Sequence, residues 1–199
     1  MTFLITLLSS IIVNNIVLAG YKGLCSYIGI SNNWKSSVGM GAALTLVCFI
    51  SGLICWGLQF ILNALSIGFL QTPVFILVVA SLVQMLEIIM KKFMPSLYKA
   101  LGIYLPLITT NCVVLGLALQ VSAYAVTSPA DGWGNQIQTV LGLCLGVPLG
   151  YYLVLILFSA IQDKLALTTT HRAFKGAALS FITTAFMAMA LIGFQGLLG

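Results

Sequence analysis

The sequence predicts an all-α integral membrane protein with six transmembrane helices. Of its 199 residues, 61% are hydrophobic and only 6% are charged, whereas a soluble domain carries about 25% charged residues. Several apolar runs also exceed the ~20 residues that a helix needs to cross a bilayer. We place the six spans at residues 2–20, 37–59, 67–90, 101–126, 135–161 and 174–198.

Positive charges are confined to one side of the predicted bundle. All eight Lys and Arg residues follow spans 1, 3 and 5, and the opposite side has none. Because basic loops face the cytoplasm, both termini are predicted to lie outside. No basic segment precedes the first span and no small-residue cleavage site follows it, so we expect this span to be retained. The basic residues are Lys22, Lys35, Lys91, Lys92, Lys99, Lys164, Arg172 and Lys175.

The six spans divide into two sets of three, residues 1–100 and 101–199, within one membrane domain. Because three is odd, the second set enters the membrane from the opposite side, as an inverted-topology repeat requires. The motif Cys-x-x-x-Gly occurs at residues 25–29 and 112–116, and the stretch 13–20 loosely matches 109–116. These matches need different offsets, 87 and 96, so the register of the repeat stays open.

The first and fourth spans are predicted to be broken helices. From residue 2 to residue 30 only Lys22 is charged, yet a helix of this length would reach about 44 Å, against a hydrocarbon core of ~30 Å. In span 4, Pro106 precedes Thr109-Thr110-Asn111, and proline breaks the helical hydrogen-bond ladder. Broken helices at matching positions of two halves point to a site in the middle of the membrane. The residues that interrupt span 1 are Asn14, Asn15, Gly20, Lys22 and Gly23.

Two cysteines lie inside these polar interruptions. Cys25 follows Tyr21-Lys22-Gly23-Leu24, and Cys112 follows the Thr-Thr-Asn stretch. Thiolates prefer soft metals, and two of them make half of a tetrahedral site. If Cys25 and Cys112 are ligands, another chain must supply the rest, either a second copy of this chain or a paralogous sister of opposite topology. From the residues alone, a metal role and an ordinary buried thiol remain open.

The other three cysteines have apolar neighbours. Cys48 and Cys55 lie on one face of span 2, and Cys144 lies in span 5. Buried free cysteine behaves as a small hydrophobic residue, so we expect these three to be packing residues. Gly142, Gly146 and Gly150 form a small-residue stripe along span 5, which predicts close approach of another helix.

Glu87 is the only acid predicted within a span, four residues before Lys91. An i,i+4 ion pair at the membrane surface is the simpler interpretation, and a place on an ion pathway is the alternative. The sequence contains no nucleophile–base arrangement, phosphate loop or dinucleotide motif. We therefore expect no catalytic residue and no bound nicotinamide or flavin in this chain.

Several motifs resemble the A subunit of the Rnf electron-transport complex, which is related to the E subunit of the sodium-pumping NADH:quinone oxidoreductase. Asn14-Asn15, where the sodium-pumping relative would show Glu-Asn, favours the Rnf side. The motifs are Val13-Asn14-Asn15-x-Val17-Leu18, Gly23-Leu24-Cys25-x-x-x-Gly29-x-Ser31, Gly39-Met40-Gly41, the long run from Leu97 through Leu105-Pro106-Leu107-Ile108-Thr109-Thr110-Asn111-Cys112 to Gly116, and Phe174-Lys175-Gly176.

The resemblance implies a multi-pass subunit of a bacterial inner membrane that pairs with a homologous sister of opposite topology. Each of the two would give two cysteines, here Cys25 and Cys112, to a shared iron–sulfur centre of the [2Fe–2S] type near the midplane. Flavins and NAD would be bound by other subunits of the complex. Such complexes transfer electrons between reduced ferredoxin and NAD⁺ and couple this to Na⁺ or H⁺ movement.

Three features depart from the family pattern. Gln162-Asp163-Lys164 replaces an Arg-Glu-Arg-like run, residues 168–172 lack a proline, and Lys22 replaces a commonly apolar residue. A cation near Cys25 can stabilise a thiolate or raise the potential of a cluster, or it can extend to the cytoplasmic interface. The rival functions are a secondary transporter with a solute or ion at the broken helices and an architectural subunit; serine at both cysteines would leave either intact.

Overall fold

A computed structural model describes residues 2–30, 34–64, 70–93, 111–127, 133–166 and 177–193. Throughout these segments the regular structure is helical, without strands, as the composition predicts. The elements are α1 (Thr2–Leu8), the π-helical turn η1 (Ser9–Val13), α2 (Leu24–Ile30), α3 (Trp34–Ala64), α4 (Gln71–Phe93), α7 (Cys112–Thr127), α8 (Trp133–Ala166) and α9 (Ala177–Ile192).

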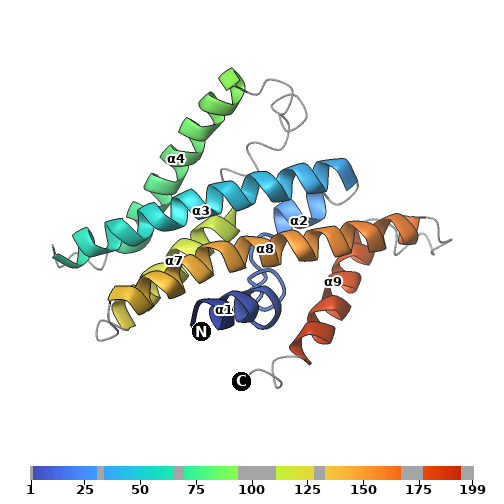
Figure 1. The fold of residues 1–199 in the computed structure, drawn as a ribbon. Coiled ribbons are helices and arrows are strands. Elements are labelled where there is room, and N and C mark those ends of the chain that lie inside the picture. The colour runs from blue at the N-terminus through green and yellow to red at the C-terminus, as the bar shows by residue number, and fades with distance from the viewer. Residues whose placement is uncertain are drawn as a thin grey trace.

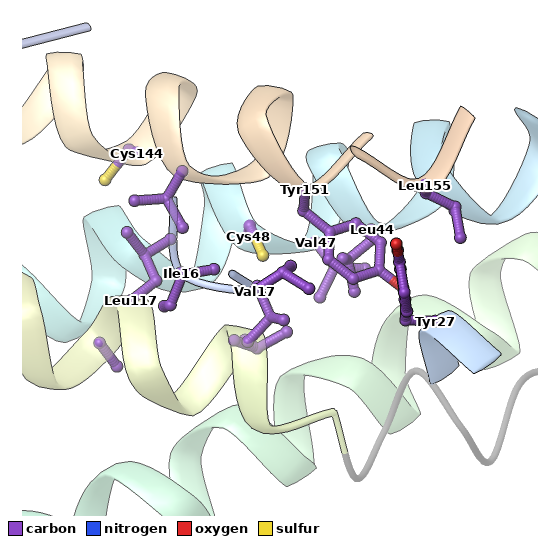
Figure 2. Packing of buried hydrophobic residues seen from close by; sticks show 14 of the residues in the cluster. Ile16, Val17, Tyr27, Leu44, Val47, Cys48, Leu117, Cys144, Tyr151 and Leu155 are labelled. Atoms are coloured by element: carbon purple, nitrogen blue, oxygen red, sulfur yellow. The ribbon is translucent and has the colours of Figure 1, made fainter. Parts of the chain in front are cut away.

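The two longest helices, α3 and α8, lie side by side and form the centre of the molecule (Figure 1). Helix α7 packs against both, α4 packs on α3 and α7, and α9 approaches η1. Side chains from α3, α7 and α8 meet in one apolar core, together with the segment between η1 and α2 (Figure 2). Leu44, Leu117, Tyr151 and Leu155 are among its fully buried members.

The glycine stripe of α8 receives α1 and η1. A Cβ atom built on Gly146 would lie 2.8 Å from the Cβ of Ser10, and one on Gly150 would lie 3.2 Å from the Cα of Ile11. Gly142 meets Thr6 in the same way, at 3.2 Å. The predicted close helix approach is therefore confirmed. It places α1 and η1, from the start of the chain, directly against α8 in its second half.

Length and composition of the helices agree with a membrane protein. Ser37–Ala64 and Gly134–Leu165 are long and apolar enough to cross a bilayer, and four shorter apolar helical stretches accompany them. Large apolar side chains face outward from α4 and α9, with Leu77 69% and Phe186 65% exposed. A soluble monomer rarely exposes so much apolar surface, so these faces suit lipid or partner subunits.

The first predicted span is interrupted in the structure. Helical geometry ends at Asn14, whose backbone N–H closes the π-turn on the Ser9 carbonyl at 2.8 Å. The chain becomes helical again at Leu24. Residues 14–23, here called the first break, therefore lie where the sequence predicted an interruption.

Several predictions fall outside the described residues. These are the break in span 4 at Pro106 and residues 109–110, most of the basic loops, and the Phe174–Gly176 motif. Glu87 lies in α4, but its side chain is also outside them. The ion pair with Lys91, the loop orientation and the division at residue 100 remain predictions.

Candidate metal centre

The structure brings the two predicted cysteines into one region, although they lie 87 residues apart. The backbone N–H of Gly23 donates a hydrogen bond to the Sγ of Cys112 at 2.9 Å. Gly23 stands two residues before Cys25, which lies in the first turn of α2. Cys112 is the first residue of α7. Both thiols therefore lie at the start of a helix that follows a polar segment, and the first break touches the second thiol directly.

Only glycine fits at position 23. Its φ angle is +86°, in the left-handed region that side chains disfavour. A Cβ there would also overlap the Cγ2 atom of Val113 and lie 3.3 Å from the Cε2 atom of Tyr151. The preceding turn includes Tyr21 at φ +51°. This turn aims the Gly23 N–H at sulfur, and an N–H donor of this kind stabilises a thiolate ligand.

A buried hydroxyl joins the starts of α2 and α7 to α8. The Oγ of Ser26 donates to the Gly23 carbonyl at 3.0 Å and accepts from the Nδ2 of Asn111 at 3.0 Å. It also pairs with the Tyr151 hydroxyl at 3.0 Å. A serine has one O–H and two acceptor positions, so Tyr151 must be the donor of this last bond. All three side chains are buried, and together they connect the starts of α2 and α7, where the two cysteines lie, to α8.

The same asparagine turn occurs in the first break and at the start of α7. The Oδ1 of Asn15 accepts from the Val17 N–H at 3.1 Å, and the Oδ1 of Asn111 accepts from the Val113 N–H at 3.1 Å. Each amide also donates to the other half of the chain: Asn15 to the Gly150 carbonyl at 3.0 Å, and Asn111 to Ser26. The two asparagine turns are separated by 96 residues, as one of the two possible registers of the repeat requires. The two cysteines are separated by 87 residues, as the other register requires.

Exposure separates the five thiols into two groups. All five are free; Cys25 and Cys112 are exposed, and the others are buried. The Sγ of Cys144 lies so close to α3 that a Cβ on Gly52 would be 2.6 Å from it. The expectation that Cys48, Cys55 and Cys144 are packing residues is confirmed. Cys25 and Cys112, by contrast, open onto the outside of the chain.

The side chain of Lys22 runs toward the second half of the protein. A Cβ on Gly116 would lie 2.8 Å from the Cδ and 3.5 Å from the Nζ of Lys22. Its backbone N–H donates to the Ile16 carbonyl at 3.2 Å. The lysine stem is thus accommodated on α7 because residue 116 has no side chain.

An uncharged groove of about 400 Å³, with a mostly apolar lining, lies beside the first break, between α1, η1, α7 and α8. Asn14 lines it, and its Nδ2 donates to the Ser9 hydroxyl at 3.4 Å. The Oε1 of Gln120, another lining residue, is buried without a protein partner. The other lining residues are Ile5, Thr6, Ser10, Tyr124, Thr139 and Leu143.

Two members of the site were missed in the sequence. Ser26 directly follows Cys25, so a serine beside a candidate ligand was a usable signal. Tyr151 carried none, because it sits in an apolar span and meets Ser26 only through the packing of α8. Among the residues that the structure describes, no three His, Cys, Asp or Glu side chains gather around one point. The donor set present, two accessible thiols with an N–H on one sulfur, fits half of an iron–sulfur ligand set.

Comparison with known proteins identifies the family. A family model described as Rnf-Nqr subunit, membrane protein, matches residues 3–198. The chain belongs to the Rnf-Nqr family. The resemblance found in the sequence motifs is therefore confirmed, and with it the assignment as a membrane protein.

Curated Rnf-Nqr relatives align along nearly the whole chain. The A subunit of the Na(+)-translocating ferredoxin:NAD(+) oxidoreductase complex of Acetobacterium woodii is 41% identical over 198 residues, covering 99% of this chain and 98% of the relative. The A subunit of an ion-translocating oxidoreductase complex from Azoarcus sp. is 42% identical over 196 residues, covering 98% and 97%. Its counterpart in Rhodobacter capsulatus is 39% identical over 199 residues, covering 98% and 97%.

Proposed function

We propose that this chain is the A subunit of an Rnf-type ion-translocating ferredoxin:NAD⁺ oxidoreductase. It relays electrons across the membrane through a [2Fe–2S] centre that it shares with a homologous sister subunit. The observation that carries the proposal is the pair of exposed thiols, Cys25 and Cys112, brought into one region because the N–H of Gly23, two residues before Cys25, donates to the Cys112 sulfur. The curated relatives are A subunits of oxidoreductase complexes, so this chain contributes to an enzyme without having a complete active site of its own.

The residues of this chain would bind and orient half of the centre. Cys25 and Cys112 supply two thiolates, the Gly23 N–H holds the second sulfur, and the Ser26 network fixes both helix starts. When bound, the centre accepts and passes on one electron. Since the apolar layer is ~30 Å thick, a relay at its middle divides one long electron transfer into two shorter ones.

The proposed architecture has six spans arranged as two inverted repeats, residues 1–100 and 101–199, with the first and fourth spans broken. The matching asparagine turns at Asn15 and Asn111 support it. The basic loops would face the cytoplasm of a bacterial inner membrane, with both termini outside. The sister subunit of opposite topology would supply the other two cysteine ligands, and further subunits would carry the flavins and iron–sulfur groups that exchange electrons with NAD⁺ and ferredoxin.

Ion movement would accompany this electron transfer, with Na⁺ or H⁺ as the coupling ion. Glu87 on α4 is the sequence's candidate for an ion pathway. A secondary transporter is the alternative that the comparisons do not favour, because the curated relatives are oxidoreductase subunits; a transporter also has no use for a thiol at each break.

The test is the iron and acid-labile sulfide content of the anaerobically purified complex, with an EPR spectrum after dithionite reduction. We expect a signal in the wild type that is missing in Cys25→Ser and in Cys112→Ser, while both variants still assemble. Cys55→Ser is the matched control, since this thiol is buried away from the site, and its signal should be normal. A wild-type complex without iron at this centre, or an unchanged signal in both variants, would refute the proposal.

A further inference from the structure

The first break carries a charge that the site described so far does not use. Between residues 2 and 30 only Lys22 is charged, and it immediately precedes Gly23, whose N–H binds the Cys112 sulfur. An ionisable group inside an apolar layer is costly and usually has a function. The position of this ammonium relative to the two thiols therefore decides what its charge can do.

The distances place the ammonium near Cys112. The Nζ atom lies 3.5 Å from the position of a Cβ on Gly116. Gly116 is four residues after Cys112 on α7, so the two positions share one face of the helix, with Cβ atoms about 5–6 Å apart. The ammonium is thus within roughly 10 Å of the Cys112 Cβ. This geometry depends on the glycine, because a side chain at residue 116 would meet the lysine stem.

Asp163, the acidic residue whose side chain the structure describes, lies too far away to neutralise this charge. The whole sequence has three acids, and of these Asp163 is the one whose side chain lies in the described part of the chain. Asp163 is twelve residues beyond Tyr151 on α8, which corresponds to roughly 18 Å along the helix. Tyr151 itself touches the Gly23 position. The field of Lys22 at the cysteines is therefore not cancelled from α8.

We infer that Lys22 is a fixed positive charge that raises the reduction potential of the centre held by Cys25 and Cys112. This inference rests on the proposed function. Reduction adds one negative charge to the centre, and a nearby cation stabilises the reduced form more than the oxidised form. At about 10 Å and an effective dielectric constant of about 20, a unit charge changes this equilibrium roughly tenfold. Lys22 acts only through its electrostatic field and is not a ligand of the centre.

The experiment is a potentiometric EPR titration of the whole purified complex. Lys22→Met removes the charge and keeps the length of the stem, and Lys22→Arg keeps the charge. Lys92→Met, at the end of α4, is the control for loss of a distant lysine. We expect Lys22→Met to lower the midpoint potential by about 59 mV, the equivalent of a tenfold change for one electron. Lys22→Arg and Lys92→Met should stay close to the wild-type value.

Each outcome has a distinct meaning. An unchanged midpoint in Lys22→Met, with a normal EPR signal, overturns the role of Lys22 and leaves the relay function standing. A similar fall in Lys92→Met also overturns it, because the effect would then be one of net charge. Absence of the signal from the wild type refutes the proposed function itself. If Lys22→Met lowers iron content, Lys22→Arg decides: a normal midpoint there supports the charge, and a lowered one contradicts it.

Discussion

Cys112 and Cys144 are the same residue type in two neighbouring helices, yet their surroundings are opposite. Cys144 is fully buried against Gly52 in the core between α3 and α8. Cys112 is exposed, begins its helix and accepts an N–H from Gly23. A packed thiol fills space, whereas an accessible thiol with a directed donor is prepared to bind something from outside. What surrounds each sulfur, more than the number of cysteines, distinguishes the site from the core.

Thiol labelling should give the largest difference between the two groups. In the detergent-solubilised protein without iron, we expect N-ethylmaleimide to modify Cys25 and Cys112 quickly. The buried thiols should react at least about a hundredfold more slowly, because they must wait for an opening that costs about 3 kcal/mol or more. Mass spectrometry of peptides before and after denaturation measures this. Rapid native labelling of Cys48, Cys55 or Cys144 would contradict the comparison.

Gly23→Ala should be the most damaging single substitution at the exposed site. The added Cβ overlaps Val113, and the backbone remains at a positive φ angle. Together these effects should destabilise the protein by about 2–5 kcal/mol. Thermal unfolding in detergent checks this, with Gly57→Ala on α3 as the control. Nothing lies within 4 Å of the Gly57 position, so that variant should be neutral or slightly stabilised.

Ser26→Ala should lower the stability of the protein by removing the hydroxyl at the centre of the buried hydrogen-bond network. It leaves the Tyr151 hydroxyl and one N–H of Asn111 without their partner. Each buried group left without a partner costs about 1–3 kcal/mol, so we expect a loss of about 2–6 kcal/mol, measured by the same thermal unfolding. Ser81→Ala removes a serine whose hydroxyl bonds only the nearby Val78 carbonyl on an exposed face, and it should change stability by less than about 0.5 kcal/mol. Equal effects in the two variants would mean that the network is not intact.

Replacing each of the two compared cysteines by serine should affect different properties: one substitution lowers the folding stability, and the other removes the iron–sulfur centre. Cys144→Ser places a hydroxyl in an apolar core, where it can return only to a carbonyl of its own helix, so we expect a loss of about 1–2 kcal/mol with a normal EPR signal. Cys112→Ser should cost almost no stability in the protein without iron, yet abolish the signal. Unfolding midpoints of the protein without iron and EPR of the anaerobically purified complex test the two effects, and the reverse pattern would exchange the roles of the two thiols.

Much of the fold could be predicted from the sequence, because apolar length and glycine spacing are local signals. The span predicted at residues 37–59 lies within α3, and the one at 135–161 lies within α8. The interruption of the first span was also readable, since Asn14, Asn15 and Gly23 cannot continue an apolar helix of that length. The helix ends were less accurate, because they depend on packing.

The site itself could be predicted only in part. Cys25 and Cys112 were identifiable by their polar neighbours, but the hydrogen bond from Gly23 to the Cys112 sulfur depends on α7 packing against the first break. Lys22 had two possible directions in the sequence, and in the structure its stem lies against Gly116, which is 94 residues away. Tyr151 could not be found, because a tyrosine in an apolar span gives no sign of the serine it will meet.

The bond from Asn15 to the Gly150 carbonyl has a consequence for how the protein is made. Its two residues are separated by 135 positions, so at a synthesis rate of about 5–20 residues per second the partner emerges about 7–27 seconds later. During that interval the first helix would lie in the membrane while the side-chain amide of Asn15 lacks its acceptor on Gly150. Insertion of α8 then closes the first break. The two halves of the chain are therefore expected to mature together and not one after the other.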